Sequence, residues 1–110
     1  MTRKKTEKCP AAAFQKMISG KYKLRIIWKL KDGPQRYNEI KRGLLTGHDE
    51  TQEVAPRVLS RELKQLCEFK VISRTDFQTH PPKVEYSLTD AGVSFLSVIE
   101  SMHKWGMKHI

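Results

Sequence analysis

Long apolar runs are missing from this sequence of 110 residues. No stretch approaches the roughly 18 apolar residues that a membrane-spanning helix needs, so we expect no contact with a membrane. The basic start, MTRKKTEKCP, is not followed by the apolar segment that a secretory signal contains. Both absences predict a cytoplasmic protein. Cysteine is also scarce, and we expect Cys9 and Cys67 to be free thiols rather than a structural disulfide.

Motifs of catalysis and of metal binding are absent as well. The sequence has no Gly-rich phosphate-binding loop, no G-x-S-x-G and no H-E-x-x-H. Four side chains of metal-ligating type lie close together at His48, Asp49, Glu50 and Glu53, but their spacing fits no known zinc site. We therefore expect no enzymatic activity, no metal and no cofactor.

Positive charge is what the sequence has in excess. The net charge is +9, and residues 21–42 alone carry eight basic and two acidic side chains. Residues 84–110, by contrast, have a net charge of −1. A basic stripe that is confined to part of a chain is typical of nucleic-acid-binding proteins. The alternative is a basic surface that is merely solvated.

Hydrophobic spacing predicts two helices in the first third of the chain. The first begins at Pro10, a residue type that favours the first helical position. The second spans residues 21–31, and the turn at 32–34, Asp-Gly-Pro, ends it. Their apolar positions are Ala13, Phe14, Met17 and Ile18 in the first helix and Leu24, Ile27, Trp28 and Leu30 in the second.

The middle of the chain predicts a pair of helices joined by a polar loop at 46–53. Asn38 is expected to cap the shorter helix. Pro56 begins the other helix, which has one apolar stripe and one polar face. The expected buried residues are Tyr37, Ile40 and Leu44 in the first helix and Leu59, Leu63 and Leu66 in the second; Arg57, Ser60, Arg61 and Lys64 form the polar face.

The last third predicts a β-hairpin followed by a long helix. Residues 71–76 and 83–88 have strand character, with FQTHPP between them, and Thr89 is a good cap for a helix that reaches about residue 108. A wide apolar arc on this helix, formed by Phe95, Leu96, Ile99, Met102 and Trp105, indicates a second partner surface. The alternative is a helix that packs only on the core of its own chain. We expect Trp28 and Trp105 in the core or in an interface.

This order of elements predicts the winged helix-turn-helix fold, which is α+β and mostly helical, as a single domain over residues 1–110. In this fold the second helix of the pair enters the major groove of DNA and the first braces it. The hairpin becomes a two-stranded wing with its tip at residues 77–83. The prolines at 81 and 82 favour an extended path for that tip.

Candidate DNA-contacting residues follow from the fold. Arginine pairs bidentately with guanine and serine reaches bases or phosphates, so the exposed face of the second helix is expected to read the sequence. The remaining residues are expected to contact phosphate or sugar. The full set is Arg36, Lys41, Arg42, Arg57, Ser60, Arg61, Lys64, His80 and Lys83. The alternative function is a winged-helix protein-interaction module without specific DNA binding, because the fold alone does not determine the partner.

Four segments resemble the HxlR-type winged helix-turn-helix regulators of bacteria and archaea, relatives of the MarR group. They are CP at 9–10, GKYKLRIIWKLKDGPQRYNEIKR at 20–42, RVLSRELKQL at 57–66 and PPKVEYSLTDAG at 81–92. The ending WGMKHI is also similar. The resemblance implies a homodimeric transcription regulator whose N- and C-terminal helices form the dimer interface, bound to an inverted-repeat operator in double-stranded DNA.

The sequence departs from the family pattern at three places. The loop at 46–53 is several residues longer than the family's turn. Ala55 replaces the usual Ser or Thr cap, a change that costs roughly 1 kcal/mol of helix stability. Lys70 replaces the usual Gly at a helix end, so we expect it either to adopt a left-handed backbone or to end the helix differently.

Cys9 is a candidate redox-sensing thiol. Some members of the family that this chain resembles sense oxidants or electrophiles through a cysteine at the CP position. The start of a helix presents unpaired N–H groups and the positive end of its dipole, and both favour the thiolate. Basic residues close in sequence, Arg3, Lys4, Lys5 and Lys8, act in the same direction. The alternative is that Cys9 has no sensing role. Cys67 is expected to be an inert, partly buried thiol.

Overall fold

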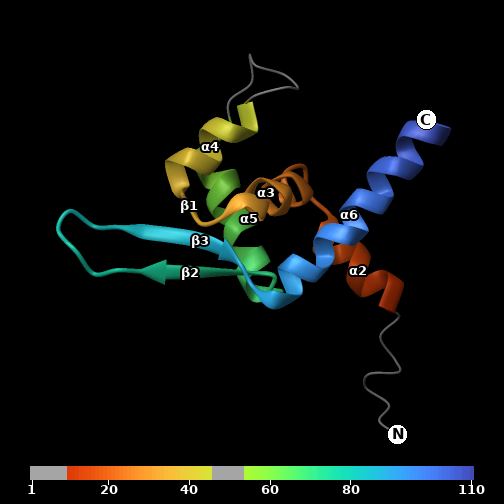
Figure 1. Ribbon diagram of the computed structural model, residues 1–110. Coiled ribbons are helices and arrows are strands. Elements are labelled where there is room, and N and C mark those ends of the chain that lie inside the picture. Colours follow the sequence, from red (N-terminus) through yellow and green to blue (C-terminus); the bar gives the residue numbers. More distant parts are fainter. Residues whose placement is uncertain (1–9, 46–53) are drawn as a thin grey trace, which may run out of the picture.

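The computed structural model describes residues 10–45 and 54–110, so the predicted loop at 46–53 lies outside the described residues. Helices and strands follow one another in the predicted order (Figure 1). The elements are α2 (Pro10–Ile18), α3 (Lys23–Lys29), the 3₁₀ turn η1 (Leu30–Asp32), β1 (Gln35–Arg36), α4 (Tyr37–Leu45), α5 (Pro56–Glu68), β2 (Ile72–Asp76), β3 (Val84–Leu88) and α6 (Asp90–His109).

The hairpin β2–β3 forms the predicted wing, but the sheet contains a third strand that the sequence did not predict. The strand order is β1-β3-β2, and both pairs are antiparallel. β1 has only two residues, Gln35 opposite Tyr86 and Arg36 opposite Glu85, and two residues are too short to show the alternation of a strand. This pairing attaches the start of α4 to strand β3 of the wing.

The start of α4 also differs from the prediction. The helix begins at Tyr37, so Asn38 lies inside the first turn and does not cap it. Glu39 performs part of the capping instead, because its Oε1 accepts a hydrogen bond from the backbone N–H of Arg36 at 2.7 Å. The strand pairing of Arg36 fixes the chain directly before the helix and therefore sets where the helix begins.

One hydrophobic core joins the helices to the sheet. The predicted stripe of α5 is confirmed, since Leu59, Leu63 and Leu66 are buried, and Ile40 and Leu44 of α4 are buried as predicted. In α3 the prediction was less accurate: Ile26 and Tyr22 enter the core, whereas Trp28 remains 37% exposed. Further core residues are Ile27, Leu30, Val54, Val71, Ile72 and Phe95.

A buried ion pair crosses this core between α3 and α5. Nζ of Lys23 lies 2.5 Å from Oε1 of Glu62, and the two side chains are 3% and 2% exposed. Gly20 packs directly against the ion pair. A Cβ at this position would lie 2.7 Å from Oε2 of Glu62, and the φ of 97° at Gly20 also favours glycine. Neither Lys23 nor Glu62 is among the residues that the sequence predicted to be buried.

The end of α5 is joined to the start of α6. Lys70 has a φ of 65°, so of the two alternatives expected there it adopts the left-handed backbone. The N–H groups of Lys70 and Val71 donate to the carbonyls of Cys67 and Leu66. The predicted cap Thr89 accepts from the N–H of Gly92 at 3.1 Å and donates to the carbonyl of Lys70 at 2.7 Å. A Cβ at Gly92 would collide with the carbonyl of Val71, so glycine permits this close approach.

The Lys23–Glu62 pair generates a stability prediction. Lys23→Met leaves the Glu62 carboxylate buried without its partner, and the free energy of unfolding should fall by about 3–5 kcal/mol. The double variant Lys23→Met/Glu62→Met removes both charges and should recover most of that loss, since an apolar replacement of a buried pair is often close to neutral. Urea denaturation of the three proteins measures both differences. Equal stability of the single variant and the wild type would contradict the burial of the pair.

Candidate nucleic-acid interface

The polar face of α5 is exposed, as the sequence predicted. Arg57, Ser60, Arg61 and Lys64 all point away from the core, because Leu59, Glu62, Leu63 and Leu66 occupy the buried side of the helix. The Arg61 side chain is 58% exposed, and its Nη2 lies 3.8 Å from Oε2 of Glu62. One N–H group of the Arg61 guanidinium therefore lies near the buried Glu62 carboxylate, and the other donors of the guanidinium remain available to solvent or a ligand.

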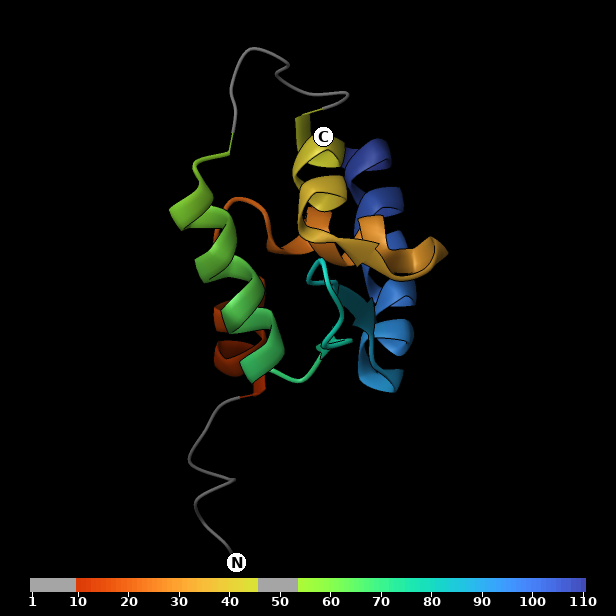
Figure 2. The same ribbon diagram turned by 90° about the vertical axis from the view of Figure 1, so that its left-hand side faces the viewer.

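The wing projects on the side of the molecule where α5 is uncovered. Figure 2 looks along the wing: the β2–β3 tip points toward the viewer and α5 runs beside it on the left. At the tip, Lys83 Nζ lies 4.6 Å from the centroid of the Phe77 ring and 3.8 Å from Oε2 of Glu85. His80 is exposed between the two strands. Hydrogen bonds from Gln78 N to Asp76 Oδ1 (2.8 Å) and from Thr79 Oγ1 to the Pro81 carbonyl (2.9 Å) hold the loop in shape.

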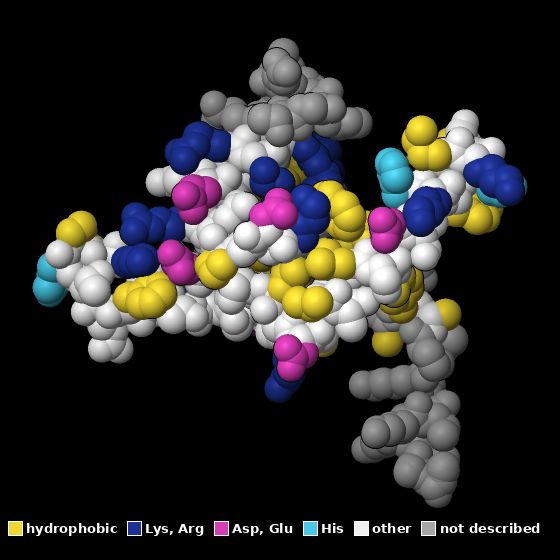
Figure 3. All heavy atoms as spheres, viewed as in Figure 1, with side chains coloured by type: hydrophobic (Ala, Val, Ile, Leu, Met, Phe, Trp, Pro, Cys, Tyr) yellow, Lys and Arg dark blue, Asp and Glu magenta, His cyan; other side chains and the backbone are white. Residues whose placement is uncertain are grey.

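The bracing helix α4 brings together only some of its predicted residues. Arg36 and Arg42 line one shallow polar pocket together with Glu39 and Glu85, whereas Lys41 is half-buried and lines neither this pocket nor the wing. The helix is fixed to its neighbours at both ends. Tyr37 donates a hydrogen bond to the Pro56 carbonyl (3.3 Å), and Arg25 donates one to the Leu44 carbonyl (2.5 Å). On the face in Figure 3, Lys and Arg side chains lie around α4 and along the wing, with Asp and Glu side chains among them, and further Lys or Arg side chains lie at the far end of α6.

A groove between α5 and the base of the wing adds residues that the sequence analysis missed. Ser60 and Lys64 line it from the helix, and the new members are Lys70, Ser73 and Arg74. The groove has a volume of about 670 Å³. Arg74 is exposed on β2, pairs with Tyr86 of β3 and lines the groove opposite Ser60 and Lys64 of α5. Arg57, Arg61, His80 and Lys83 do not line this groove.

Only one of the two cysteines lies in the part of the chain that the structure describes. Cys9 lies outside the described residues. Cys67 is half-buried on α5, as predicted, and is a free thiol at the inner wall of the groove. Burial raises the pKa of the Cys67 thiol and outweighs the opposing effect of the Arg74 guanidinium; the Glu68 carboxylate raises the pKa further. At neutral pH this thiol is protonated and a weak nucleophile.

Apolar side chains remain exposed on α2 and α6. The α6 residues Val98, Met102 and Trp105 follow one another at helical spacing, and Trp105 is 61% exposed. Phe14 of α2 is 37% exposed and meets the buried Phe95 edge-on, with ring centroids 5.6 Å apart. Trp28 and Trp105 are therefore outside the core of the single chain. Their assignment to an interface stays a prediction.

Within residues 10–45 and 54–110, no three His, Cys, Asp or Glu side chains are grouped closely enough to hold a metal ion. None of the helices in this same part of the chain is long and apolar enough to cross a membrane. The residues 48–53, which the sequence analysis considered as metal ligands, lie outside the described residues.

Comparison with known proteins extends the likeness to the whole chain. Residues 17–110 match the HxlR-like helix-turn-helix family. The regulatory protein MalR of Fusobacterium mortiferum is 34% identical over 99% of this chain and 97% of its own length. Two solved structures are similar: the redox regulator HypR in its oxidized form (TM-score 0.77, 29% identity, 93% of this chain and 98% of that one) and the reduced form of the transcriptional regulator YodB from B. subtilis (TM-score 0.76, 27% identity, 93% and 94%).

The surroundings of Cys67 predict its reactivity. In a Cys9→Ser background, alkylation of Cys67 by iodoacetamide at pH 8 should be several-fold slower than that of free cysteine, because a raised pKa leaves less thiolate. Arg74→Gln removes a charge that lowers the pKa and should slow the reaction further. Glu68→Gln removes a charge that raises it and should speed the reaction. If both variants change the rate in the same direction, charge is not the cause.

Proposed function

Because the chain belongs to the HxlR-like helix-turn-helix family, we propose that it is a homodimeric, sequence-specific DNA-binding regulator that recognises an inverted-repeat operator. Family membership makes it a helix-turn-helix transcriptional regulator and not an enzyme. In the proposal the chain acts as a single domain in the cytoplasm. Its α5 enters the major groove, α4 contacts the backbone and the wing contacts sugar and phosphate.

One observation carries the proposal: α5, whose Arg57, Arg61 and Lys64 are exposed, lies beside the wing, which projects toward the viewer in Figure 2. A duplex that meets α5 there would also meet the wing residues His80 and Lys83. Lys70 and Arg74 add cations to the groove between these elements, where a phosphate strand would pass. The rival function is a winged-helix protein-interaction module, which would not need cations at each of these places.

Duplex binding at two salt concentrations separates the two functions. For an operator duplex, affinity should fall by about 10³–10⁵ between 50 and 200 mM salt if six to ten phosphates are contacted. Arg61→Ala should cost about 1–3 kcal/mol of binding free energy, centred on one base pair, if Arg61 reads a base. Lys83→Ala should weaken all duplexes by a similar factor, because phosphate contacts carry no sequence information. Fluorescence anisotropy measures each of these affinities.

The outcomes contradict different parts of the proposal. Binding that ignores salt, or no binding near micromolar concentration, favours the protein-interaction module. An Arg61→Ala protein that binds its operator as tightly as the wild type rules out the proposed role of Arg61 in base reading. Lys31→Ala is a suitable control, because Lys31 is an exposed lysine of η1, outside both the proposed DNA-contacting residues and the proposed dimer helices α2 and α6.

The exposed stripe of α6 predicts dimerisation. We expect Val98, Met102 and Trp105 to pair with α2 and α6 of a second copy across a two-fold axis. The two α5 helices would then meet half-sites about 10–11 base pairs apart or a multiple of this. Trp105→Glu should give a monomer in sedimentation at tens of micromolar and lose operator affinity. Val93→Glu places the same charge on α6 outside the stripe and should stay dimeric. A monomeric wild type would contradict this arrangement.

Cys9 remains the candidate sensor. It is the residue directly before Pro10, where α2 begins, and the similar protein HypR is described as a redox regulator. Mild oxidant or quinone should change operator binding by the wild type and leave Cys9→Ser unaffected. Cys67→Ser should respond like the wild type if Cys9 acts without Cys67. An unaffected wild type, or an equal response of wild type and Cys9→Ser, would show that Cys9 is not the sensor.

A further inference from the structure

Arg61 differs from the other cations on the exposed face of α5. Its Nη2 lies 3.8 Å from Oε2 of Glu62, whose side chain is only 2% exposed, whereas the Arg61 side chain is 58% exposed. Among the ion pairs of residues 10–45 and 54–110, none involves Arg57 or Lys64. A long side chain on a helix surface samples many rotamers in solvent. Of these three cations, Arg61 is therefore the one that has a buried anion beside it.

The Glu62 carboxylate is itself held from inside the protein. Its Oε1 accepts a hydrogen bond from Nζ of Lys23 at 2.5 Å, and the Lys23 side chain is 3% exposed. Gly20 packs against both carboxylate oxygens, since a Cβ there would lie 2.7 Å from Oε2 and 2.9 Å from Oε1. A buried charge that leaves its partner is costly, so the carboxylate stays where it meets Lys23. A cation that pairs with this carboxylate is thereby restricted to one region of the helix surface.

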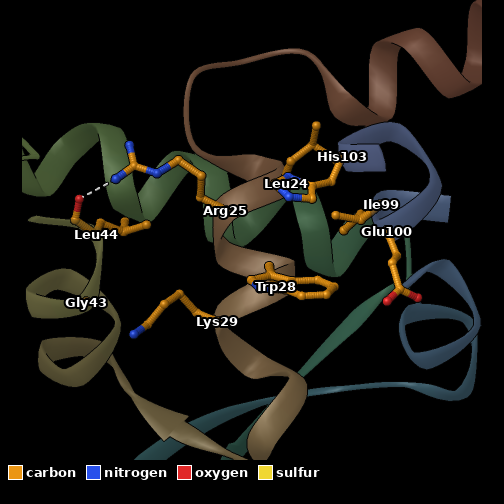
Figure 4. A pocket seen from close by; sticks show the side chains of 9 residues that line it. All are labelled: Leu24, Arg25, Trp28, Lys29, Gly43, Leu44, Ile99, Glu100 and His103. Atoms are coloured by element: carbon orange, nitrogen blue, oxygen red, sulfur yellow. Dashed lines mark hydrogen bonds between the residues drawn. The ribbon is translucent and has the colours of Figure 1, made fainter. Parts of the chain in front are cut away.

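The helix that carries Lys23 is firmly attached to its neighbour α4. Two residues further along α3, Arg25 donates a hydrogen bond to the Leu44 carbonyl at the end of α4 (2.5 Å; Figure 4). One turn later, the Lys29 stem lies so close to Gly43 of α4 that a Cβ at this glycine would collide with Cε of the lysine. The cation that holds the carboxylate therefore belongs to a fixed element.

A guanidinium can meet a carboxylate and a base at the same time. It has five N–H donors in one plane, and its contact with Glu62 through Nη2 leaves further donors for O6 and N7 of a guanine. Orienting this plane before DNA arrives removes part of the cost of ordering Arg61 on binding. The nearby anion also weakens the attraction of Arg61 for phosphates, which every sequence offers equally. Both effects favour base reading over non-specific contact.

We propose that Glu62 is a positioning residue for Arg61 and contributes to sequence discrimination without touching DNA. The buried pair of Lys23 and Glu62 orients the guanidinium, and Arg61 contacts one guanine of the operator. This role rests on the proposed function, in which α5 enters the major groove. The buried pair then has a second role besides its contribution to stability.

Selection from a random duplex library tests the role in recognition. The base pair that Arg61 reads is the one whose preference is lost in Arg61→Ala. Lys23→Met/Glu62→Met removes the anion without leaving an unpaired buried charge, and it should reduce the preference at that base pair by about two- to twelvefold. Preferences at the other positions of the half-site should stay as in the wild type. Equal weakening across the half-site would indicate a displaced α5 and overturn the proposal.

A double-mutant cycle determines whether Glu62 acts through Arg61. Lys23→Met/Glu62→Met should lower the affinity for the selected duplex about two- to twelvefold in the wild-type background and have no further effect in Arg61→Ala. Arg57→Ala is the matched background on the same face; it lowers the affinity by itself, but the effect of the double change should remain. Fluorescence anisotropy measures these affinities, and urea denaturation verifies that each protein is folded. Equal effects in the wild-type and Arg61→Ala backgrounds would contradict the positioning role.

Side-chain order in the wild-type protein gives a test that needs no change of the buried pair. ¹⁵N relaxation of the arginine Nε–Hε groups measures this order on the ps–ns timescale, and Arg61→Lys and Arg57→Lys identify the two peaks. In the free protein, the Nε–Hε group of Arg61 should have a higher order parameter than that of Arg57. Equal order parameters overturn the proposal, whatever the duplex experiments give.

Different results contradict the role of Glu62 and the proposed function. A wild type that selects no sequence contradicts the proposed function and, with it, a role of Glu62 in recognition. If the preferences of the wild type survive in Lys23→Met/Glu62→Met, the role of Glu62 is wrong and the proposed function stands. If Arg61→Ala selects the wild-type sequence, the role of Glu62 is also wrong, because Glu62 acts only through Arg61.

Discussion

The ion pair between Lys23 and Glu62 constrains the rest of this structure most strongly. Two charges buried at 3% and 2% exposure are costly to remove from water, so they tolerate only the arrangement in which they meet. Glu62 shares the buried side of α5 with Leu59, Leu63 and Leu66. A rotation of α5 by one residue would separate the pair and bury part of the basic face. The orientation of Arg61 and Ser60 toward solvent therefore depends on a contact on the opposite side of the helix.

The same helix is fixed at its end as well as along its length. The left-handed turn at Lys70 brings the chain back to Thr89, whose hydroxyl donates to the Lys70 carbonyl and accepts from Gly92. The last turn of α5 and the first turn of α6 are thus held by one side chain and by one close backbone contact. Because α6 also packs on α3, a tilt of α6 is transmitted to the helix that the ion pair attaches to α5. A displacement of α6 can therefore reach the basic face of α5 through α3 and the Lys23–Glu62 pair.

Local patterns account for what the sequence predicted well. The leucine stripe of α5, the two hairpin strands, the Thr89 cap and the backbone at Lys70 all follow from residues within one turn or one strand of each other. The failures involve partners far apart in sequence. Glu62 is 39 residues from Lys23 in the sequence. Strand β1 exists only because Gln35 and Arg36 pair with Tyr86 and Glu85 of β3. The start of α4 follows β1, so the error at Asn38 has the same origin as the missed strand.

The number of basic residues in a segment of the sequence does not tell which of them reach the proposed DNA-binding face. Residues 21–42 have the largest excess of basic over acidic side chains. Within this segment, however, Lys23 forms the buried ion pair with Glu62, and Arg25 donates a hydrogen bond to the Leu44 carbonyl. Neither contributes to the face that α5 and the wing share. Arg74 and Lys70, in a segment with little net charge, line the groove beside α5 because β2 pairs with β3 there. A basic stripe in a sequence thus indicates that cations are available, and the sheet and the core determine which of them face a polyanion.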